Sequence, residues 1–307
     1  MVSLCGLVLL VSSPCLQARE TIDLSWALQQ TLANNQALAT YPLQQARAEA
    51  LRLQAGVRPV PTLELTVENA LGDGEYNNMD SAETTLTLSQ VIELGEKRQW
   101  RLKLASASVD QLEAEYELSR LDVLAETSRR FYHLLVVQQR QALNQQRIKD
   151  EQTALFSIRK RANAGAIGKA DVAKMDLRLA RSKAEQLQLT EDKAIAKIRL
   201  AAMWQAEPAF DSAMGKLDAP PKLPRSETVI SAIERTPALL NKLALQRLSD
   251  AQLQVAKADG RSDLNLGIGV RHLEASDDQA LVMSFSMPLA FSNPNRGRIK
   301  AAQAERD

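Results

Sequence analysis

Residues 159–172 read RKRANAGAIGKADV, and they interrupt a long stretch that is rich in helix-forming residues. Gly165 and Gly168 lie here between Asn163 and Asp171. Glycine adopts the positive φ angles that a tight turn needs, and Gly165 is placed to end an incoming helix. The carboxylate of Asp171 is placed to cap the free N–H groups of an outgoing helix. The stretch therefore predicts the turn of a helical hairpin.

The arms of this predicted hairpin are unusually long. Residues 96–160 have the composition of one helix, which would measure about 100 Å at 1.5 Å per residue. Apolar residues recur in it every seven positions, with small or apolar residues between them: Leu102, Val109, Tyr116 and Val123, then Ala105 and Leu112. After the glycines, Val172, Met175 and Leu179 restart a similar seam that continues to about Trp204. The pattern predicts a coiled coil over residues 96–204.

Before the hairpin, the period of the sequence changes from helical to alternating. Residues 24–56 are rich in helix formers, and Gly56, Pro59 and Pro61 follow them. In TLELTVEN (62–69) and TTLTLSQ (84–90), leucine and valine alternate with polar residues, and the intervening LGDGEYNNMD is typical of a loop. We therefore expect a helix over 24–56 and a β-hairpin over 62–91.

The same order of elements occurs a second time. NNQAL (34–38) and RTPAL (235–239) are 201 residues apart, and so are the strand starts near Thr62 and Asp263. DLNLGIGV and LVMSFSMPL alternate around the loop ASDDQ, which predicts a second β-hairpin over 263–290. The chain thus divides into a first repeat (19–225), with a connector of little regular structure at 205–225, and a second repeat (226–307).

The first eighteen residues, MVSLCGLVLLVSSPCLQA, have the apolar core and small-residue end of a secretory signal peptide. Both cysteines of the chain, Cys5 and Cys15, lie in this segment, so a mature chain would have no disulfide and no thiol nucleophile. Cys15 is also a candidate lipid anchor. The formal net charge of +1 gives no basic face, and we expect no nucleic-acid partner.

Four alternating strands are compatible with two architectures. Such strands can place their apolar side on lipid and their polar side on water, provided that several chains close a common barrel and leave no free edge. They can also form a soluble β-sandwich that covers one end of a coiled coil. The alternation alone leaves both open.

Three motifs resemble those of the TolC-like outer-membrane efflux proteins, and of their cobalt–zinc–cadmium resistance branch in particular. SQVIELGEKRQWRLKLA (Ser89–Ala105) and FSMPLAFSNPNRGRIKAAQAE (Phe285–Glu305) are similar to the family's two strand-to-helix junctions, and RANAGAIGKADV (Arg161–Val172) is similar to its hairpin turn. The order of elements over nearly the whole mature chain matches as well. The fold class implied is mainly α with a small β part, in which long helical hairpins form a coiled-coil tunnel.

The resemblance also implies an assembly and partners. It implies a homotrimer in which each chain gives four strands to a 12-stranded barrel in outer-membrane lipid, with the tunnel extending into the periplasm. The duct would passively export metal ions or other small toxic solutes, together with a periplasmic adaptor (membrane fusion) protein and an inner-membrane RND-type pump. The adaptor would dock at the tip of the hairpin, on Arg161, Asn163, Ala164, Gly165, Ile167, Gly168, Asp171 and Val172.

The sequence departs from this family pattern at one point. About 110 residues of helix and connector follow the first strand-to-helix junction at Gly95, whereas the sequence ends at Asp307, ten residues after Gly297. The second long helical hairpin expected from the family is missing, so we expect a fragment or a truncated reading frame.

The sequence shows no candidate chemistry. His133 and His272 are far apart, and neither belongs to a spacing typical of zinc or copper ligands. We interpret His133 as a packing or surface residue and His272 as a solvated strand end. There is no nucleophile elbow and no phosphate-binding loop. We therefore expect no cofactor, no metal site and no enzyme; the alternative to a duct is a periplasmic coiled-coil adaptor or scaffold protein without channel activity.

Overall fold

The computed structural model of the chain describes residues 19–217, 225–289 and 292–307. The predicted signal peptide 1–18, with the candidate lipid anchor Cys15, lies outside the described residues. The chain divides into two compact units, Met1–Thr40 with Ser119–Arg225 and Tyr41–Leu118 with Ser226–Asp307. Long helices make up most of both units, and the strands are few, which confirms the predicted class of mainly α with a small β part.

The helix predicted over 24–56 is wrong as a continuous element. The structure has three helices there, α1 (Leu24–Asn34), α2 (Gln36–Ala39) and α3 (Tyr41–Ala55). Asn35 leaves the helical conformation at φ −73° and ψ 128°, and its side-chain oxygen accepts a hydrogen bond from the Ala37 N–H. An asparagine cap satisfies a free N–H group at the start of α2, so the chain ends one helix and begins another within a single residue.

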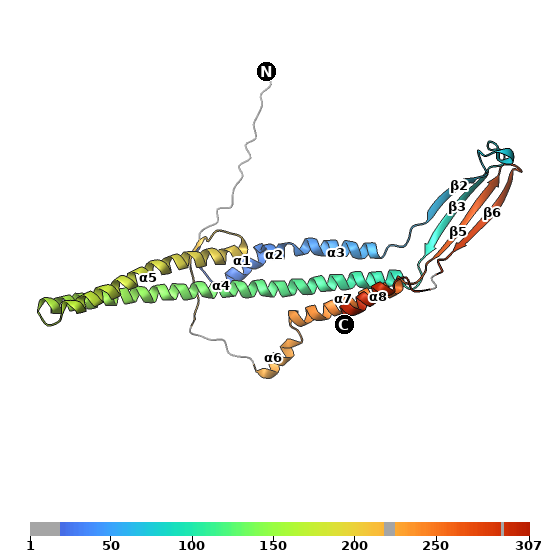
Figure 1. The fold of residues 1–307 in the computed structure, drawn as a ribbon. Coiled ribbons are helices and arrows are strands. Elements are labelled where there is room, and N and C mark those ends of the chain that lie inside the picture. The colour runs from blue at the N-terminus through green and yellow to red at the C-terminus, as the bar shows by residue number, and fades with distance from the viewer. Residues whose placement is uncertain (1–18, 218–224, 290–291) are drawn as a thin grey trace, which may run out of the picture. The chain divides into compact units, whose positions relative to one another are not determined.

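Two long helices form the predicted hairpin. Helix α4 (Lys97–Asn163) runs through both units, and α5 (Lys169–Ala201) lies against its second part in the first unit (Figure 1). A short 3₁₀ helix, η2 (Ala202–Trp204), follows α5. Near the turn, Leu155, Met175 and Leu179 form a buried cluster between the two helices. The seam residues Met175 and Leu179 are thus buried as the seven-residue pattern predicts.

The base of the first unit holds two strands that the sequence does not predict. Strand β1 (Arg19–Ile22) pairs in parallel with β4 (Phe210–Ala213). The expectation of little regular structure in the connector is therefore wrong at β4. Gln138 of α4 fixes this strand, because its side chain donates to the Ala213 carbonyl (3.0 Å) and accepts from the Ala213 N–H (2.8 Å). Beside the strands lies the largest apolar cluster, which includes Phe131, Leu134, Leu200, Trp204 and Phe210.

The second unit contains one antiparallel sheet in the order β2-β3-β5-β6 (Figure 1). Its strands are β2 (Thr62–Glu68), β3 (Glu83–Ile92), β5 (Leu264–Leu273) and β6 (Asp278–Ser286). A 3₁₀ helix, η1 (Gly74–Tyr76), lies in the loop between β2 and β3. The two hairpins pair with each other through β3 and β5, in a register that sets Leu86 opposite Val270 and Leu88 opposite Ile268.

Three further helices belong to the second repeat: α6 (Ser226–Ile233), α7 (Pro237–Ala258) and α8 (Arg296–Arg306). Thr236 caps α7, and a proline occupies the start of the helix, where its missing N–H is not needed. Leu253 and Ala256 of α7 pack on Ala302 of α8, and the buried Asn295 donates to the Ala256 carbonyl at 2.6 Å. Among the described residues, no helix has both the length and the apolar character required to cross a lipid bilayer.

Candidate functional site: the two-faced sheet and the tip of the helical hairpin

The sheet of the second unit has one face made almost entirely of exposed apolar side chains. Because successive side chains of a strand point to opposite faces, the cross-strand register places the apolar residues of all four strands on one side. Their exposed fractions run from 40% for Leu266 to 76% for Met283. The face consists of Leu63, Leu65, Val67, Leu86, Leu88, Leu266, Ile268, Val270, Leu281, Met283 and Phe285. A contiguous apolar surface of this kind marks a contact with lipid or with another protein.

The opposite face of the sheet is polar, and Arg271 organises it near the loops. Its guanidinium contacts three groups on two other strands: Glu83 Oε2 at 2.7 Å, Glu68 Oε2 at 3.3 Å and Thr85 Oγ1 at 3.0 Å. Glu68 and Glu83 lie directly opposite each other on β2 and β3. Arg271 therefore separates two carboxylates that would otherwise repel each other.

Two glycines leave the polar face of β5 bare. A Cβ atom on Gly267 would lie 2.3 Å from Ser284 Oγ, and one on Gly269 would lie 2.5 Å from the Leu86 carbonyl oxygen. Both distances are below any normal contact. At these two positions only glycine fits, so the polar face there consists of backbone and of the hydroxyl groups of neighbouring strands.

The junction between β3 and α4 is fixed by charged contacts to β5 and α3. Lys97 pairs with Asp263 at 2.7 Å, and the same carboxylate accepts from the Leu94 N–H at 3.1 Å. Arg98 Nε donates to the Gly56 carbonyl at 2.7 Å. Arg101 pairs with Glu93, and this hydrogen bond raises the pKa of Arg101 above its ordinary value. The junction is thus anchored on both neighbouring segments.

The turn of the helical hairpin is closed by Gly165. This residue has φ +76°, its N–H donates to the Ala162 carbonyl, and the next N–H, of Ala166, donates to the Arg161 carbonyl. This pair of bonds is the Schellman arrangement, in which a left-handed residue ends the helix. The prediction that Gly165 ends the incoming helix is confirmed.

Two details predicted for the same turn are wrong. Gly168 has φ −79° and ψ 155°, an ordinary extended conformation, so it does not supply positive φ. Gly168 is itself the residue that precedes α5, and no side chain caps this helix. Asp171 lies in the first turn of α5, where its charge interacts favourably with the helix dipole without a capping hydrogen bond. The extended backbone of Gly168 places Asp171 too far into the helix to act as its cap.

The residues predicted to receive an adaptor lie together at this turn. Ile167 and Val172 are half-buried, and the other members of the set are exposed. The set comprises Arg161, Asn163, Ala164, Gly165, Ile167, Gly168, Asp171 and Val172. Below it, Arg159 pairs with Asp176 at 2.7 Å across the two helices. The turn is therefore a small and largely exposed surface, in which small and apolar residues stand beside three polar ones, Arg161, Asn163 and Asp171.

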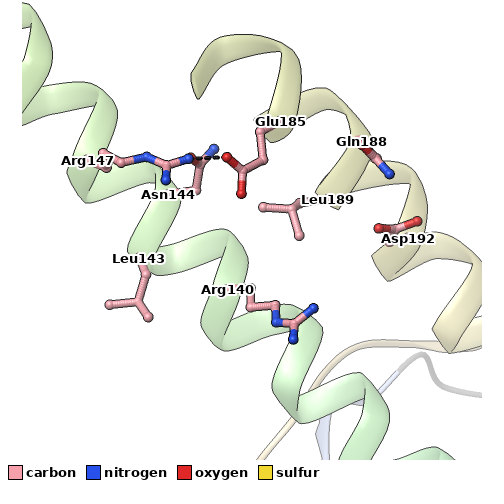
Figure 2. Close-up of a pocket in the computed structure, with 8 residues that line it drawn as sticks. All are labelled: Arg140, Leu143, Asn144, Arg147, Glu185, Gln188, Leu189 and Asp192. Atoms are coloured by element: carbon pink, nitrogen blue, oxygen red, sulfur yellow. Dashed lines mark hydrogen bonds and ion pairs between the residues drawn. The ribbon is translucent and has the colours of Figure 1, made fainter. Parts of the chain in front are cut away.

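Polar side chains form a layer between the two helices in the middle of the hairpin, which the sequence analysis does not predict. Asn144 is 4% exposed, and its Nδ2 donates to the Ser182 carbonyl (2.9 Å) and to Gln186 Oε1 (2.8 Å) of α5. Arg147 contacts both Asn144 and Glu185 (Figure 2). Asn144 continues the seven-residue series of Leu102, so its phase in the seam was the signal that could have revealed it.

A groove of about 470 Å³ opens beside this layer, between α4 and α5 (Figure 2). It is lined by Arg140, Leu143, Asn144, Arg147, Glu185, Gln188, Leu189 and Asp192. Its lining mixes both signs of charge with two leucines and contains no candidate nucleophile next to a base. The groove therefore offers charged and amide groups for polar contacts.

The two histidines do not meet. His133 is exposed on α4. His272 is half-buried, with Nε2 3.2 Å from Glu274 Oε2 and Nδ1 buried without a hydrogen-bond partner among the described residues, so the side chain of this strand end is solvated only in part. Within the parts of the chain that the structure describes, no group of three histidine, cysteine or acidic residues is placed to hold a metal ion.

Comparison with known sequences places these features among transport proteins. The family model described as outer membrane efflux protein matches residues 27–205. The cobalt-zinc-cadmium resistance protein CzcC of Cupriavidus metallidurans is 25% identical over 256 residues, which cover 83% of this chain and 60% of CzcC. The nickel-cobalt-cadmium resistance protein NccC of Alcaligenes xylosoxydans xylosoxydans is 22% identical over 296 residues, which cover 96% of this chain and 67% of NccC. The chain thus spans about 60% to 67% of the length of these relatives.

Comparison with solved structures gives the same fold. The structure of CusC, whose description refers to transmembrane channel formation, superposes with a TM-score of 0.72 at 12% identity. The match covers 92% of this chain and 69% of CusC. The long helical hairpin and the sheet are therefore arrangements that this chain shares with a solved channel protein.

Proposed function

Because the chain belongs to the outer membrane efflux protein family, we propose that it is a subunit of an outer-membrane duct through which a tripartite pump exports its substrate. The observation that carries this proposal is the apolar face of the sheet, whose side chains are 40% to 76% exposed in a single chain. In water such a face would be costly, at about 25 cal/mol per Å² of apolar surface. In a bilayer it would be the face that contacts lipid.

The unpaired edges of the sheet indicate that several copies of the chain associate. β2 and β6 are the outer strands, and among the strands that the structure describes each pairs with one neighbour. An unpaired strand edge is not tolerated in hydrocarbon, since no water is present to bond its N–H and C=O groups. We propose that β6 of one copy pairs with β2 of the next, and that three copies close a 12-stranded barrel with the polar face inside.

A pair of neighbouring substitutions on β2 tests the lipid contact. Leu65 lies on the apolar face and Glu64 on the polar face. A lysine on the lipid face of a barrel costs about 2–4 kcal/mol near the bilayer midplane, whereas a lysine on the inner face costs little. We expect Leu65→Lys to remove the heat-resistant trimer from outer-membrane fractions, as followed by gel mobility with and without boiling, and Glu64→Lys to retain it.

The two substitutions also separate the duct from the alternative of a soluble scaffold. In a soluble protein, both positions are already exposed to water, so both lysines would be tolerated. A wild-type chain found in the soluble periplasmic fraction, or a Leu65→Lys variant that trimerises like the wild type, would contradict the duct.

We propose that the exposed turn at Gly165 is the docking surface for a periplasmic adaptor, which links the duct to an inner-membrane pump of the RND type. Ala164, Gly165 and Ala166 are all exposed and small, so a helix of another protein can approach their backbone closely. The names of CzcC and NccC favour divalent metal ions, such as cobalt, zinc, nickel and cadmium, as the exported solutes.

A substitution at Gly165 tests the docking surface. Nothing lies within 4 Å of the place where a Cβ would be, so a larger side chain meets no clash within the chain, and its cost is that of the positive φ alone. We expect Gly165→Trp to form a trimer but to abolish adaptor cross-linking and growth at raised cobalt, zinc or cadmium concentrations.

The matched control is Gly165→Asn. Asparagine tolerates a positive φ angle, so it keeps the turn and adds little bulk. We expect this variant to retain cross-linking and growth in metal. Normal cross-linking in Gly165→Trp would contradict docking at the turn, and metal tolerance that does not depend on the chain would contradict metal export.

A further inference from the structure

The two ends of the sheet carry opposite charge. At the loop end, residues 68–83 and 271–278 include eight Asp and Glu but only one Arg. At the helix end, residues 57–61, 93–101, 259–263 and 292–298 include seven Lys and Arg and four Asp and Glu. The apolar face lies between these ends. Cations gathered at one border of an apolar surface are typical of the side that contacts anionic headgroups.

A pocket of about 460 Å³ lies at the helix end of the sheet, beside the junction of β3 and α4. Its cations are Arg58, Lys97 and Arg98, and its anions are Glu93 and Glu96. Two of these charges are already compensated, because Lys97 pairs with Asp263 and Glu93 pairs with Arg101. Arg58 and Arg98 therefore outnumber the remaining anion, Glu96.

Both arginines have donors to spare. Among the described residues, no hydrogen bond or ion pair holds the exposed guanidinium of Arg58. Arg98 donates from Nε to the Gly56 carbonyl, which fixes the side chain and leaves its two terminal nitrogens available. Two guanidinium groups of this kind match the oxygen atoms of a phosphate.

The pocket continues onto the apolar face. Gln90 lines it and also lines a second hollow, of about 590 Å³, on the sheet. That hollow is bordered by Pro61, Leu88, Leu266, Ile268, Met283 and Phe285. Gln90 is held in place, since its amide donates to the Pro59 carbonyl at 2.8 Å. A cationic hollow joined to an apolar one is the combination that accommodates a phosphate headgroup with acyl chains.

We propose that this pocket binds the headgroup of an anionic phospholipid, such as phosphatidylglycerol, whose acyl chains lie on the apolar face of the sheet. The inference rests on the proposed outer-membrane location. It adds to that location a specific lipid contact at the helix end of the sheet. Arg58 and Arg98 contact the phosphate, and Lys97 holds the junction through Asp263.

Flotation of the full chain with vesicles tests the site. One set of vesicles contains phosphatidylcholine alone, and the other also contains phosphatidylglycerol. We expect the wild type to bind the anionic vesicles more tightly, and each arginine removed to weaken this preference about fivefold. Arg58→Gln breaks no hydrogen bond or ion pair among the described residues, and it measures the loss of one arginine. The double variant Arg58→Gln, Arg98→Gln measures the loss of both.

The matched control is Lys242→Gln, Arg247→Gln, which removes the same charge from exposed positions on α7 of the same unit. We expect it to keep the preference of the wild type. A control that loses the preference as the pocket variants do, or pocket variants that keep it, would overturn the site. A wild type that floats equally with both vesicles would overturn the headgroup site alone, whereas one that floats with neither would overturn the membrane location as well.

Discussion

At the scale of single residues, Arg271 is the side chain that balances the negative charges on the polar face of the sheet. It is the only cation on that face among the described strands, and it contacts Glu68 and Glu83, which stand opposite each other. Its side chain is 34% exposed, so solvent screens the interaction and the net effect is modest. We expect Arg271→Gln to destabilise the assembled sheet by about 1 kcal/mol. The heat-resistant oligomer should then dissociate about 2–4 °C lower in a boiling series.

A second substitution identifies the cause of this loss. In Arg271→Gln, the two carboxylates face each other without a cation between them. Adding Glu83→Gln removes one of the two like charges, and we expect the dissociation temperature to return towards that of the wild type. A double variant as unstable as the single one would show that repulsion between Glu68 and Glu83 is not the reason.

At the scale of elements, the seam of the helical hairpin combines an apolar part near the turn with a polar layer at Asn144. A buried asparagine in a coiled-coil seam fixes the register of the two helices at a cost in stability. Asn144→Leu would leave Gln186 without its partner, and we expect it to lower the free energy of unfolding by about 1–2 kcal/mol. Urea unfolding followed by circular dichroism measures this change.

Replacing Gln186 as well as Asn144 is expected to cancel or reverse the loss of stability. Replacing both Asn144 and Gln186 by leucine leaves no orphaned amide and adds apolar contact, which is nearly neutral or stabilising. We therefore expect the double variant to unfold at or above the urea midpoint of the wild type. If the double variant were weaker than Asn144→Leu alone, the layer would stabilise the hairpin rather than only fix its register.

An element could be predicted where its sequence has a repeating pattern, and could not where it depends on a distant partner or on a single side chain. The alternation of β2, β3, β5 and β6 and the seven-residue period of α4 each repeat over many residues, so sequence alone locates them. β1 and β4 have four residues each and pair across about 190 positions, so neither carries a period. The break at Asn35 depends on two hydrogen bonds of one side chain, which accepts from the Ala37 N–H and donates to the Met203 carbonyl. The helix-favouring composition of the surrounding residues does not reveal them.

The candidate site also has features that the sequence could predict and features that it could not. Gly165 was predictable because only glycine readily takes the left-handed geometry that ends α4. The roles of Gly168 and Asp171 were not, because they depend on where α5 begins to within one turn. The contacts of Arg271 and Lys97 join residues more than 160 positions apart, so they follow only from the pairing of the two repeats.

At the scale of the whole molecule, the repeat explains how a sheet of four strands can serve an assembly. Each repeat supplies one hairpin, and the inner strands β3 and β5 join them, so the outer strands β2 and β6 come from different repeats. The two free edges are therefore unlike, and joining β6 of one copy to β2 of the next is a heterologous contact, which generates a ring when the rotation closes. The β3–β5 pairing within the chain is the pattern for that contact, because β6 occupies in the second repeat the place of β3 in the first. A duplicated hairpin thus supplies its own partner once, and in the proposed trimer the neighbouring copies would supply the others.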